Sequence, residues 1–120
     1  MAHYALQAAY TPLGWAALLR DPQHRLEAIK PVIERLGGTV VTGWLMFGDY
    51  DLLVICELPD NTRAAALSMA ISAGGAAKAV KIAPLMSFED GLEAMSEARA
   101  AGYAPPRSEI PYFGVYRGGA

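Results

Sequence analysis

Residues 39–58 read TVVTGWLMFGDYDLLVICEL, and this stretch decides the fold. It contains two runs rich in β-branched and apolar residues, 39–47 and 51–58, separated by Gly48-Asp49-Tyr50. Two such runs around a short turn predict an antiparallel β-hairpin. Both runs are apolar on both faces, whereas an antiparallel hairpin usually leaves one face to water. We therefore expect helices on one face and the sheet of a second copy of the chain on the other.

A strand and a helix are predicted before the hairpin. Residues 3–10 are apolar on both sides, which is typical of a buried strand. Residues 13–19 are expected to form one short helical turn. Asp21-Pro22 then supplies a capping side chain and a proline at the first helical position, so a helix is predicted to start there.

This helix is expected to be amphipathic. Ile29 and Ile33 recur at helical spacing, and Arg25 is among the charged residues assigned to the opposite side. Pro31 removes one helical hydrogen bond, so a kink or an irregular turn is predicted before it. The glycine pair at residues 37–38 permits the left-handed exit of the helix.

Two helices and a strand are predicted after the hairpin. Asp60 is expected to cap a helix that the glycine pair at residues 74–75 ends. A strand is predicted around residues 78–85. A last helix over residues 88–101, with Ser87 and Asp90 as its capping pattern, is predicted to stop at Gly102.

The order of these elements predicts an α+β, ferredoxin-like βαββαβ fold with an antiparallel four-stranded sheet. We expect one domain over residues 1–102, which includes the C-terminal helix, and an extended arm over residues 103–120. The arm is expected to be ordered, because its large apolar side chains would be costly to leave in water. They are Ile110, Tyr112, Phe113, Val115 and Tyr116.

Composition favours a homodimer or a higher homo-oligomer. The 120 residues are 53% hydrophobic and 18% charged, which leaves few polar side chains to cover a monomer. Lys plus Arg number 10 against 12 for Asp plus Glu, without the basic excess that nucleic-acid binding requires. We therefore expect no nucleic-acid partner.

A cytoplasmic location without a membrane partner is expected. Cys56 is the only cysteine, so no intrachain disulfide can form. The uncharged stretch over residues 1–19 lacks the basic start of a signal peptide and is interrupted by polar residues and a Thr11-Pro12 turn. The uncharged run at residues 64–77 is short for the ~20 residues of a membrane span.

Six short segments, taken in order, resemble the GYD domain family, small bacterial proteins named for a Gly-Tyr-Asp signature. The resemblance covers about residues 1–95, and here Asp49 stands between the glycine and the Tyr-Asp pair. It implies the dimeric α/β barrel superfamily, in which two ferredoxin-like sheets pack face to face, and it transfers no catalytic residue. The segments are Tyr10-Thr11-Pro12 with Gly14, Arg25-Leu26-Glu27-Ala28, Leu36-Gly37-Gly38, Gly48-Asp49-Tyr50-Asp51, Glu57-Leu58-Pro59-Asp60 and Ala64-Ala65-Ala66-Leu67.

The signature residues support two interpretations. Gly48, Tyr50 and Asp51 would line a pocket mouth, with Asp51 as a weak candidate general base and Tyr50 as a hydrogen-bond donor. In the structural interpretation, the glycine supplies a positive φ and the carboxylate of Asp51 bonds backbone N–H groups across the turn.

Aromatic side chains form the second candidate group. Tyr10, Trp15 and Trp44 would wall a cavity for an aromatic compound between sheet and helices, or would pack in the core or dimer interface. Gln7 lies mid-strand among apolar residues, so its amide needs partners either across the dimer axis or in a pocket.

No metal or cofactor is expected. His3 and His24 are the only imidazoles, and neither has another His or Cys ligand at close spacing. Each histidine is expected at the surface or as a cap rather than as an axial heme ligand. Cys56 is expected as a small core residue, because reactive thiols need exposure and nearby positive charge.

Two functions follow from the sequence. The first is a small-molecule-binding dimeric α/β barrel that acts without a cofactor on an aromatic or polyketide-like compound if it is an enzyme at all. The second is a non-catalytic oligomeric module that binds a protein partner through its surface or its C-terminal arm. A cavity between sheet and helices favours the first, and a filled core with a docked arm favours the second.

Overall fold

The structure is a computed structural model that describes residues 1–107. It contains two compact units, Met1–Ser87 and a second that begins at Phe88, and each is described by itself. The first unit holds the whole sheet and three helices.

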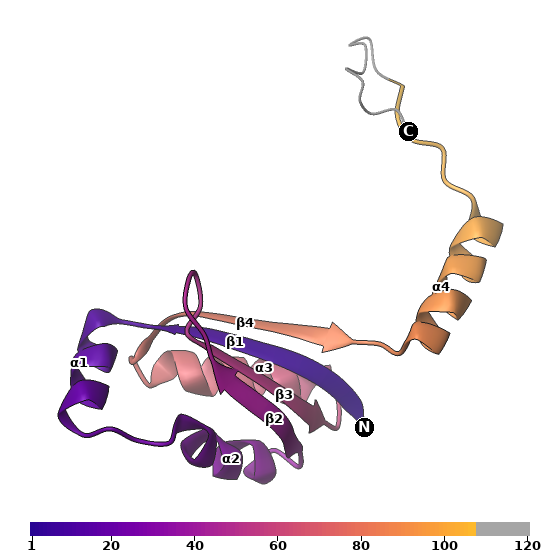
Figure 1. The fold of residues 1–120 in the computed structure, drawn as a ribbon. Coiled ribbons are helices and arrows are strands. Elements are labelled where there is room, and N and C mark those ends of the chain that lie inside the picture. Colours follow the sequence, from indigo (N-terminus) through magenta and orange to yellow (C-terminus); the bar gives the residue numbers. More distant parts are fainter. Residues whose placement is uncertain (108–120) are drawn as a thin grey trace. The chain divides into compact units, whose positions relative to one another are not determined.

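The sheet has four strands, β1 (Ala2–Tyr10), β2 (Thr39–Leu45), β3 (Leu52–Leu58) and β4 (Ala77–Leu85). Its order is β2-β3-β1-β4, and every neighbouring pair is antiparallel. Figure 1 shows β1 and β3 in the centre of the sheet. With the helices between the strands, this topology confirms the predicted ferredoxin-like fold.

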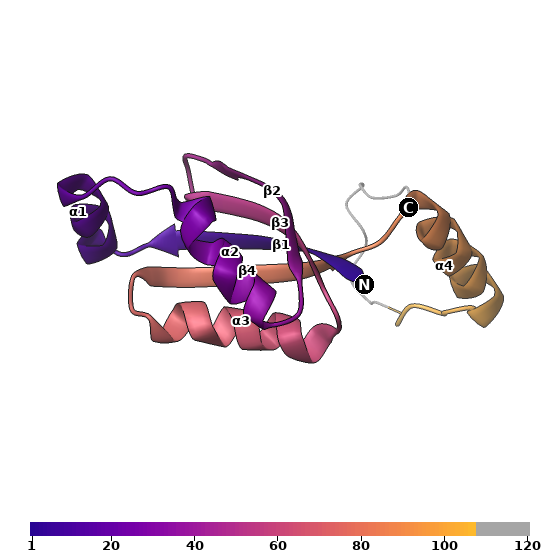
Figure 2. The same cartoon turned by 90° about the horizontal axis from the view of Figure 1, so that it is seen from below.

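Two helices cover one face of the sheet, α2 (Arg25–Arg35) and α3 (Asn61–Ala73), as Figure 2 shows. Strand residues alternate, so Leu6, Val54 and Cys56 point into this layer and are fully buried. The residues between them, such as Gln7, Leu53 and Ile55, are only half-buried and form what we call the open face of the sheet. The core therefore lies on one side of the sheet only. Its buried residues are Tyr4, Leu6, Ala8, Ile29, Ile33, Leu52, Val54, Cys56, Leu58, Ala64 and Leu67.

The short turn predicted at residues 13–19 is a nine-residue helix, α1 (Pro12–Arg20). Thr11 caps it, because its Oγ1 accepts the Gly14 N–H at 2.9 Å, and Pro12 occupies the first turn. The predicted start of the next helix at Asp21-Pro22 is wrong. Asp21 instead ends α1, and α2 begins at Arg25 with His24 Nδ1 accepting the Glu27 N–H at 3.3 Å.

The cause of this error is local. A polar capping residue followed by proline occurs twice within a dozen residues, at Thr11-Pro12 and at Asp21-Pro22, and only the first pair begins a helix. The irregular turn predicted before Pro31 is also not seen, since α2 is assigned as a continuous helix through that residue.

Other helix boundaries follow the prediction. The Asp60 carboxylate accepts the Arg63 N–H at 3.0 Å and caps α3, which ends at Gly74. A side chain at Gly43 in β2 would meet the Leu26 methyl carbon at 2.8 Å, so the glycine lets α2 lie close to β2.

The two edge strands of the sheet differ in chemistry. β4 carries exposed Lys78 and Lys81 and contains Pro84, which has no N–H to offer a further strand. β2 is interrupted by a register shift between Val40 and Thr42. Proline, exposed lysines and bulges are features that oppose edge-to-edge pairing of sheets.

The second unit contains α4 (Phe88–Ala101), with the range predicted from the sequence. Gly102 follows in a left-handed conformation, with φ of +66°. One side of α4 is apolar and open to solvent: Phe88, Leu92 and Met95 are 93%, 65% and 68% exposed. Most of the predicted arm, including its apolar residues from Ile110 to Tyr116, lies outside the described residues.

Candidate functional site

A cavity of about 280 Å³ lies between the helix layer and the sheet. It occupies the end of the sheet where α2 begins, α3 ends and β1 ends, a region visible in Figure 2. Ligand sites in proteins occupy about 300–1,000 Å³ and are mostly apolar with a few polar groups. The size fits a compound smaller than a typical drug. The lining residues are Ala8, Tyr10, Arg25, Ala28, Ile29, Val32, Leu52, Ala70, Ile71, Gly74, Ala76 and Ala77.

Tyr10 ends β1 and forms part of the cavity wall, where it is 7% exposed. Its ring meets that of Trp15 edge to face, with 5.2 Å between centroids and 73° between planes. Such aromatic pairs are worth about 0.5–1.5 kcal/mol beyond the area that they bury. The pair fixes the ring of Tyr10 against α1.

The backbone of Tyr10 is held by Asp51. The pairing of β1 with β4 shifts between Ala9 and Tyr10, and the Tyr10 N–H donates to Asp51 Oδ2 at 2.9 Å. The Asp51 N–H in turn donates to the carbonyl oxygen of Ala8 at 2.9 Å. Asp51 therefore extends the β1–β3 pairing by one step and satisfies the backbone where the ladder becomes irregular.

A second backbone contact holds this end of the cavity. The Thr11 N–H donates to the carbonyl oxygen of Ala76 at 2.8 Å, in the turn between α3 and β4. A side chain at Gly14 would lie 2.6 Å from the same oxygen, which leaves no room for a larger residue there. The start of α1 is thus fixed against the turn that supplies Ala76 and Ala77 to the cavity wall.

Among the described residues, Arg25 is the one charged residue in the cavity wall, and Tyr10 supplies the one phenol there. The Arg25 side chain is half-buried, and its Nη1 donates to Gln23 Oε1 at 3.0 Å. Its Nε is shielded from solvent and has no hydrogen-bond partner among the described residues. An unpaired buried donor is costly and rare, so the Nε–H group of this guanidinium is available to a further hydrogen-bond acceptor.

Arg25 also borders a second hollow of about 370 Å³ beside β2. The two hollows share Arg25 and Leu52, so the guanidinium lies between them. The second hollow contains Trp44, which is 57% exposed. Its lining residues are Gln23, His24, Arg25, Leu26, Gly43, Trp44, Leu45 and Leu52.

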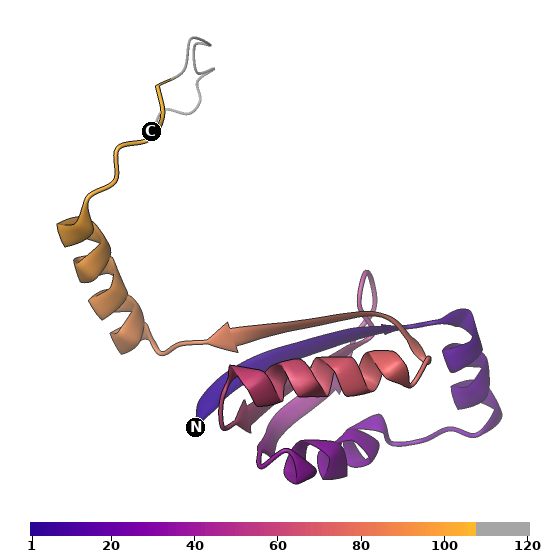
Figure 3. The same cartoon turned by 180° about the vertical axis from the view of Figure 1, so that it is seen from behind.

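The tip of the signature hairpin is separate from both hollows. Gly48 has a φ of +119°, the left-handed conformation expected from the sequence, and nothing lies within 4 Å of the place where its side chain would be. Figures 1 and 3 show the loop between β2 and β3 projecting from the sheet on the side away from α2. Neither hollow includes Tyr50 or Asp51 among its lining residues.

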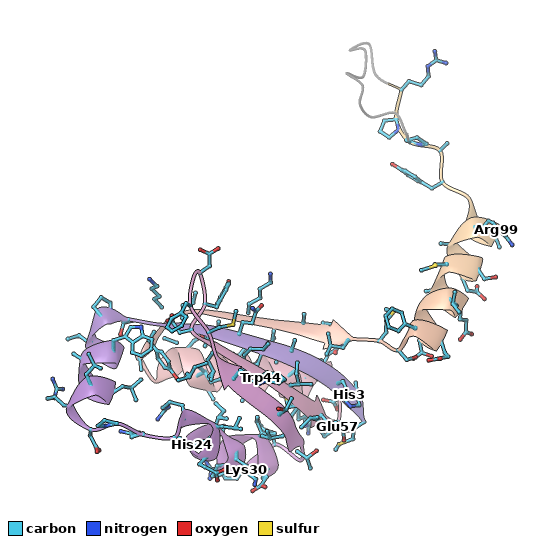
Figure 4. All side chains as sticks on the ribbon, in the orientation of Figure 1. His3, His24, Lys30, Trp44, Glu57 and Arg99 are labelled. Carbon is cyan, nitrogen blue, oxygen red and sulfur yellow. The ribbon has the colours of Figure 1, made fainter. Side chains whose placement is uncertain are left out.

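The sequence-based candidates are therefore only partly brought together. Tyr10, Trp15 and Asp51 form one contact group at the end of β1. Trp44 lies in the second hollow, and Gln7 lies on the open face, paired with Leu53 and Lys81. Figure 4 labels Trp44 on β2, and it also labels His3 and Glu57, whose Nε2 and Oε2 atoms lie 3.0 Å apart.

Sequence reasoning missed Arg25, which it assigned to the polar side of its helix. Positions 25, 28, 29 and 32 follow helical spacing, and all four residues line the cavity. The same spacing that identified Ile29 as inward-facing would have placed Arg25 on that face.

The described residues hold neither a metal-ligand cluster nor a helix that could span a membrane. Residues 1–107 contain no group of three or more His, Cys, Asp or Glu side chains that could hold a metal ion. None of the helices described there is both long enough and apolar enough to cross a bilayer. Cys56 is fully buried, and burial raises the pKa of its thiol to about 11, as expected of a core residue.

Comparison with known proteins gives one match. The GYD domain matches residues 4–95, which include β2 to β4, all of β1 except its first two residues, α1 to α3 and the signature hairpin. No curated protein and no solved structure matches the chain. The match covers most of the chain and confirms the resemblance inferred from the short segments, and on this basis the chain belongs to the GYD domain family.

Proposed function

We propose that the protein binds a small, largely apolar molecule in the cavity between its sheet and helices. The observation that carries this proposal is the cavity itself: about 280 Å³, with apolar walls, one arginine and one tyrosine. Apolar pockets with a few convergent polar groups are the usual form of small-molecule sites. An aromatic or polyketide-like compound has the required apolar body.

A catalytic role for Asp51 receives little support from its contacts. A general base must be free to accept a proton from the substrate, whereas one oxygen of this carboxylate already accepts the Tyr10 N–H. Asp51 also does not line the cavity. Binding is therefore the better supported part of the proposal, and any chemistry would use the Tyr10 hydroxyl or the Arg25 guanidinium.

A homodimer that joins two open faces is part of the same proposal. The open face carries half-buried Leu53 and Ile55 in β3, and Trp44 pairs with Leu53 from β2. Burial of such apolar surface in a dimer interface would contribute about 25 cal/mol per Å² to the free energy of association. A second copy of the same sheet supplies a matching surface.

Native mass spectrometry of protein purified without denaturation tests the proposal. We expect a small molecule to remain bound to the wild type and to be lost from Ala70→Phe, which introduces a large side chain at the cavity wall. Ala65→Phe is the matched control, because Ala65 is an exposed residue of the same helix outside that wall. Equal retention by Ala70→Phe and the wild type would contradict the proposal.

A second function, a non-catalytic module that binds a protein partner, is supported by α4. Its three exposed apolar residues, Phe88, Leu92 and Met95, follow helical spacing and form one stripe. Solvent-facing stripes of this kind mark docking surfaces. Replacing all three by serine should then abolish recovery of a partner from cell extract while the retained small molecule is unaffected. If the protein binds only a small molecule, the triple serine variant should match the wild type both in the proteins recovered from extract and in the small molecule retained.

A further inference from the structure

The wall of the cavity is mostly apolar, but it includes the positively charged side chain of Arg25. Every lining residue except Arg25 is uncharged. Burying part of a guanidinium beside apolar walls costs free energy unless an opposite charge or several acceptors compensate. Within residues 1–107, the side chain of Arg25 has one hydrogen-bond partner, the exposed side chain of Gln23 two residues away.

The guanidinium also retains unused donors. Arginine has five N–H groups in a planar fork, of which Nη1 donates one to Gln23. Nε is shielded and unpaired. Presenting the Nε edge of the fork to a ligand in the cavity requires a rotation of this side chain. That edge matches a carboxylate, which accepts two parallel hydrogen bonds from it.

We infer that the ligand of this cavity is a small apolar carboxylic acid, with its carboxylate on Arg25 and its apolar body among Ala28, Ile29, Val32 and Ile71. This inference rests on the proposed function, because it names the class of compound bound at the same site. A carboxylate carries one negative charge, which a single arginine balances. A phosphate monoester carries close to two, and the cavity offers no second cation.

The Tyr10 hydroxyl supports the same ligand class. Tyr10 lines the cavity, and no hydrogen bond of its hydroxyl to the described residues is found. A phenol donates readily to a carboxylate oxygen or to a ring oxygen of the ligand. The two polar groups of the wall thus both act as donors toward an acceptor-rich ligand.

The experiment compares the binding of three carboxylic acids with that of their primary amides, which have nearly the same shape but no charge. The probes are benzoate, 3-phenylpropionate and 2-naphthoate, each compared with its neutral primary amide by titration calorimetry at pH 7. Wild-type protein should bind at least one acid tenfold or more tightly than its amide, as expected for a charge-assisted pair. Ala70→Phe should weaken the binding of that acid, which places it in the cavity.

Variants of Arg25 test whether this residue causes the preference for the acid over its amide. Arg25→Gln should reduce the preference for the acid to within about twofold, and Arg25→Lys should keep part of it, since lysine retains charge without the fork. Arg35→Gln is the matched control, because Arg35 is an exposed residue of the same helix that lines neither hollow. It should leave the preference unchanged.

The outcomes separate the two proposals. Equal binding of acid and amide by the wild type, or a preference that survives in Arg25→Gln, overturns the carboxylate inference and leaves the cavity as a site for neutral compounds. Failure of every acid and every amide to bind overturns both. If Arg25→Gln does not fold, Arg25→Lys decides: an undiminished preference in that variant contradicts recognition by the arginine fork.

Discussion

The carboxylate of Asp51 accepts the backbone N–H of Tyr10 at 2.9 Å, although the two residues are 41 positions apart. This contact joins the hairpin that gives the family its name to the strand end that lines the cavity. It assigns the last residue of the signature to the support of the cavity wall.

Removing the carboxylate should lower stability and disturb the cavity together. Asp51→Ala leaves the Tyr10 N–H without its partner, which costs about 1–3 kcal/mol in the free energy of unfolding. Asp51→Asn keeps an acceptor oxygen at that place and should lose clearly less. Urea denaturation of both variants measures the difference. A well-folded Asp51→Asn protein that binds its ligand normally but has lost all activity would instead support a general base.

Substitution of Gly48 should lower the stability of the protein because of its backbone conformation alone. Gly48 has a φ of +119°, and nothing lies within 4 Å of its would-be side chain, so Gly48→Val is opposed by conformation and not by a clash. We expect a loss of about 1–3 kcal/mol, the range for a strained backbone. Gly74→Ala is the control, because its φ of −70° suits any residue. That variant should be neutral or slightly stabilised in the same thermal melts.

If two copies associate through the open face, a charged substitution on that face should reduce the sedimentation mass from that of a dimer to that of one chain. Ile55→Lys should convert a dimer into a monomer in sedimentation experiments at micromolar concentration, because it brings two positive charges into the interface. The half-buried position allows the lysine stem to lie along the sheet in the monomer, so the chain should still fold. Thr62→Lys, an exposed α3 position, should leave the mass unchanged. A wild type that sediments as a single chain would contradict the proposed assembly.

Cys56 makes stability depend on pH in the alkaline range. Burial raises the pKa of its thiol from 9.0 to about 11, so the unfolded chain releases this proton before the native chain does. The contribution to stability is full below pH 9 and is lost as pH rises from 9 toward 11. At about 1.36 kcal/mol per pKa unit, the total is roughly 2–3 kcal/mol.

Comparison with Cys56→Ala isolates this effect from the tyrosines and lysines that titrate in the same range. The stability difference between wild type and variant should shrink between pH 9 and pH 11. A thiol reagent at pH 8 should label Cys56 slowly in the native protein and rapidly in urea. Rapid labelling of the native protein would show that the thiol is accessible and the burial argument wrong.

Local patterns predicted the order of the elements, because caps and turns depend on neighbouring residues. Asp60 caps α3 and Gly102 ends α4 as expected. The start of α2 was mispredicted because a cap followed by proline occurs twice, and local sequence does not show which of the two begins a helix.

The site was less predictable than the fold. The bond between Asp51 and Tyr10 joins residues that no local pattern connects, and it arises only from the pairing of β1 with β3. Arg25 was within reach of helical spacing, but its lack of a partner for Nε depends on the surrounding packing. Aromatic residues were chosen for their chemistry, and of Tyr10, Trp15 and Trp44 only Tyr10 lines the cavity between sheet and helices that Arg25 also lines.

The two edges of the sheet have a consequence for the solubility of the isolated chain. The open face carries apolar Leu53 and Ile55 beside polar Gln7, and sheets with exposed apolar side chains can grow into fibrils by adding strands edge to edge. Pro84 and the two positive charges of Lys78 and Lys81 oppose that growth at the β4 edge. The register shift in β2 opposes it at the β2 edge. Growth of the sheet by edge-to-edge addition of strands is thereby disfavoured on both sides.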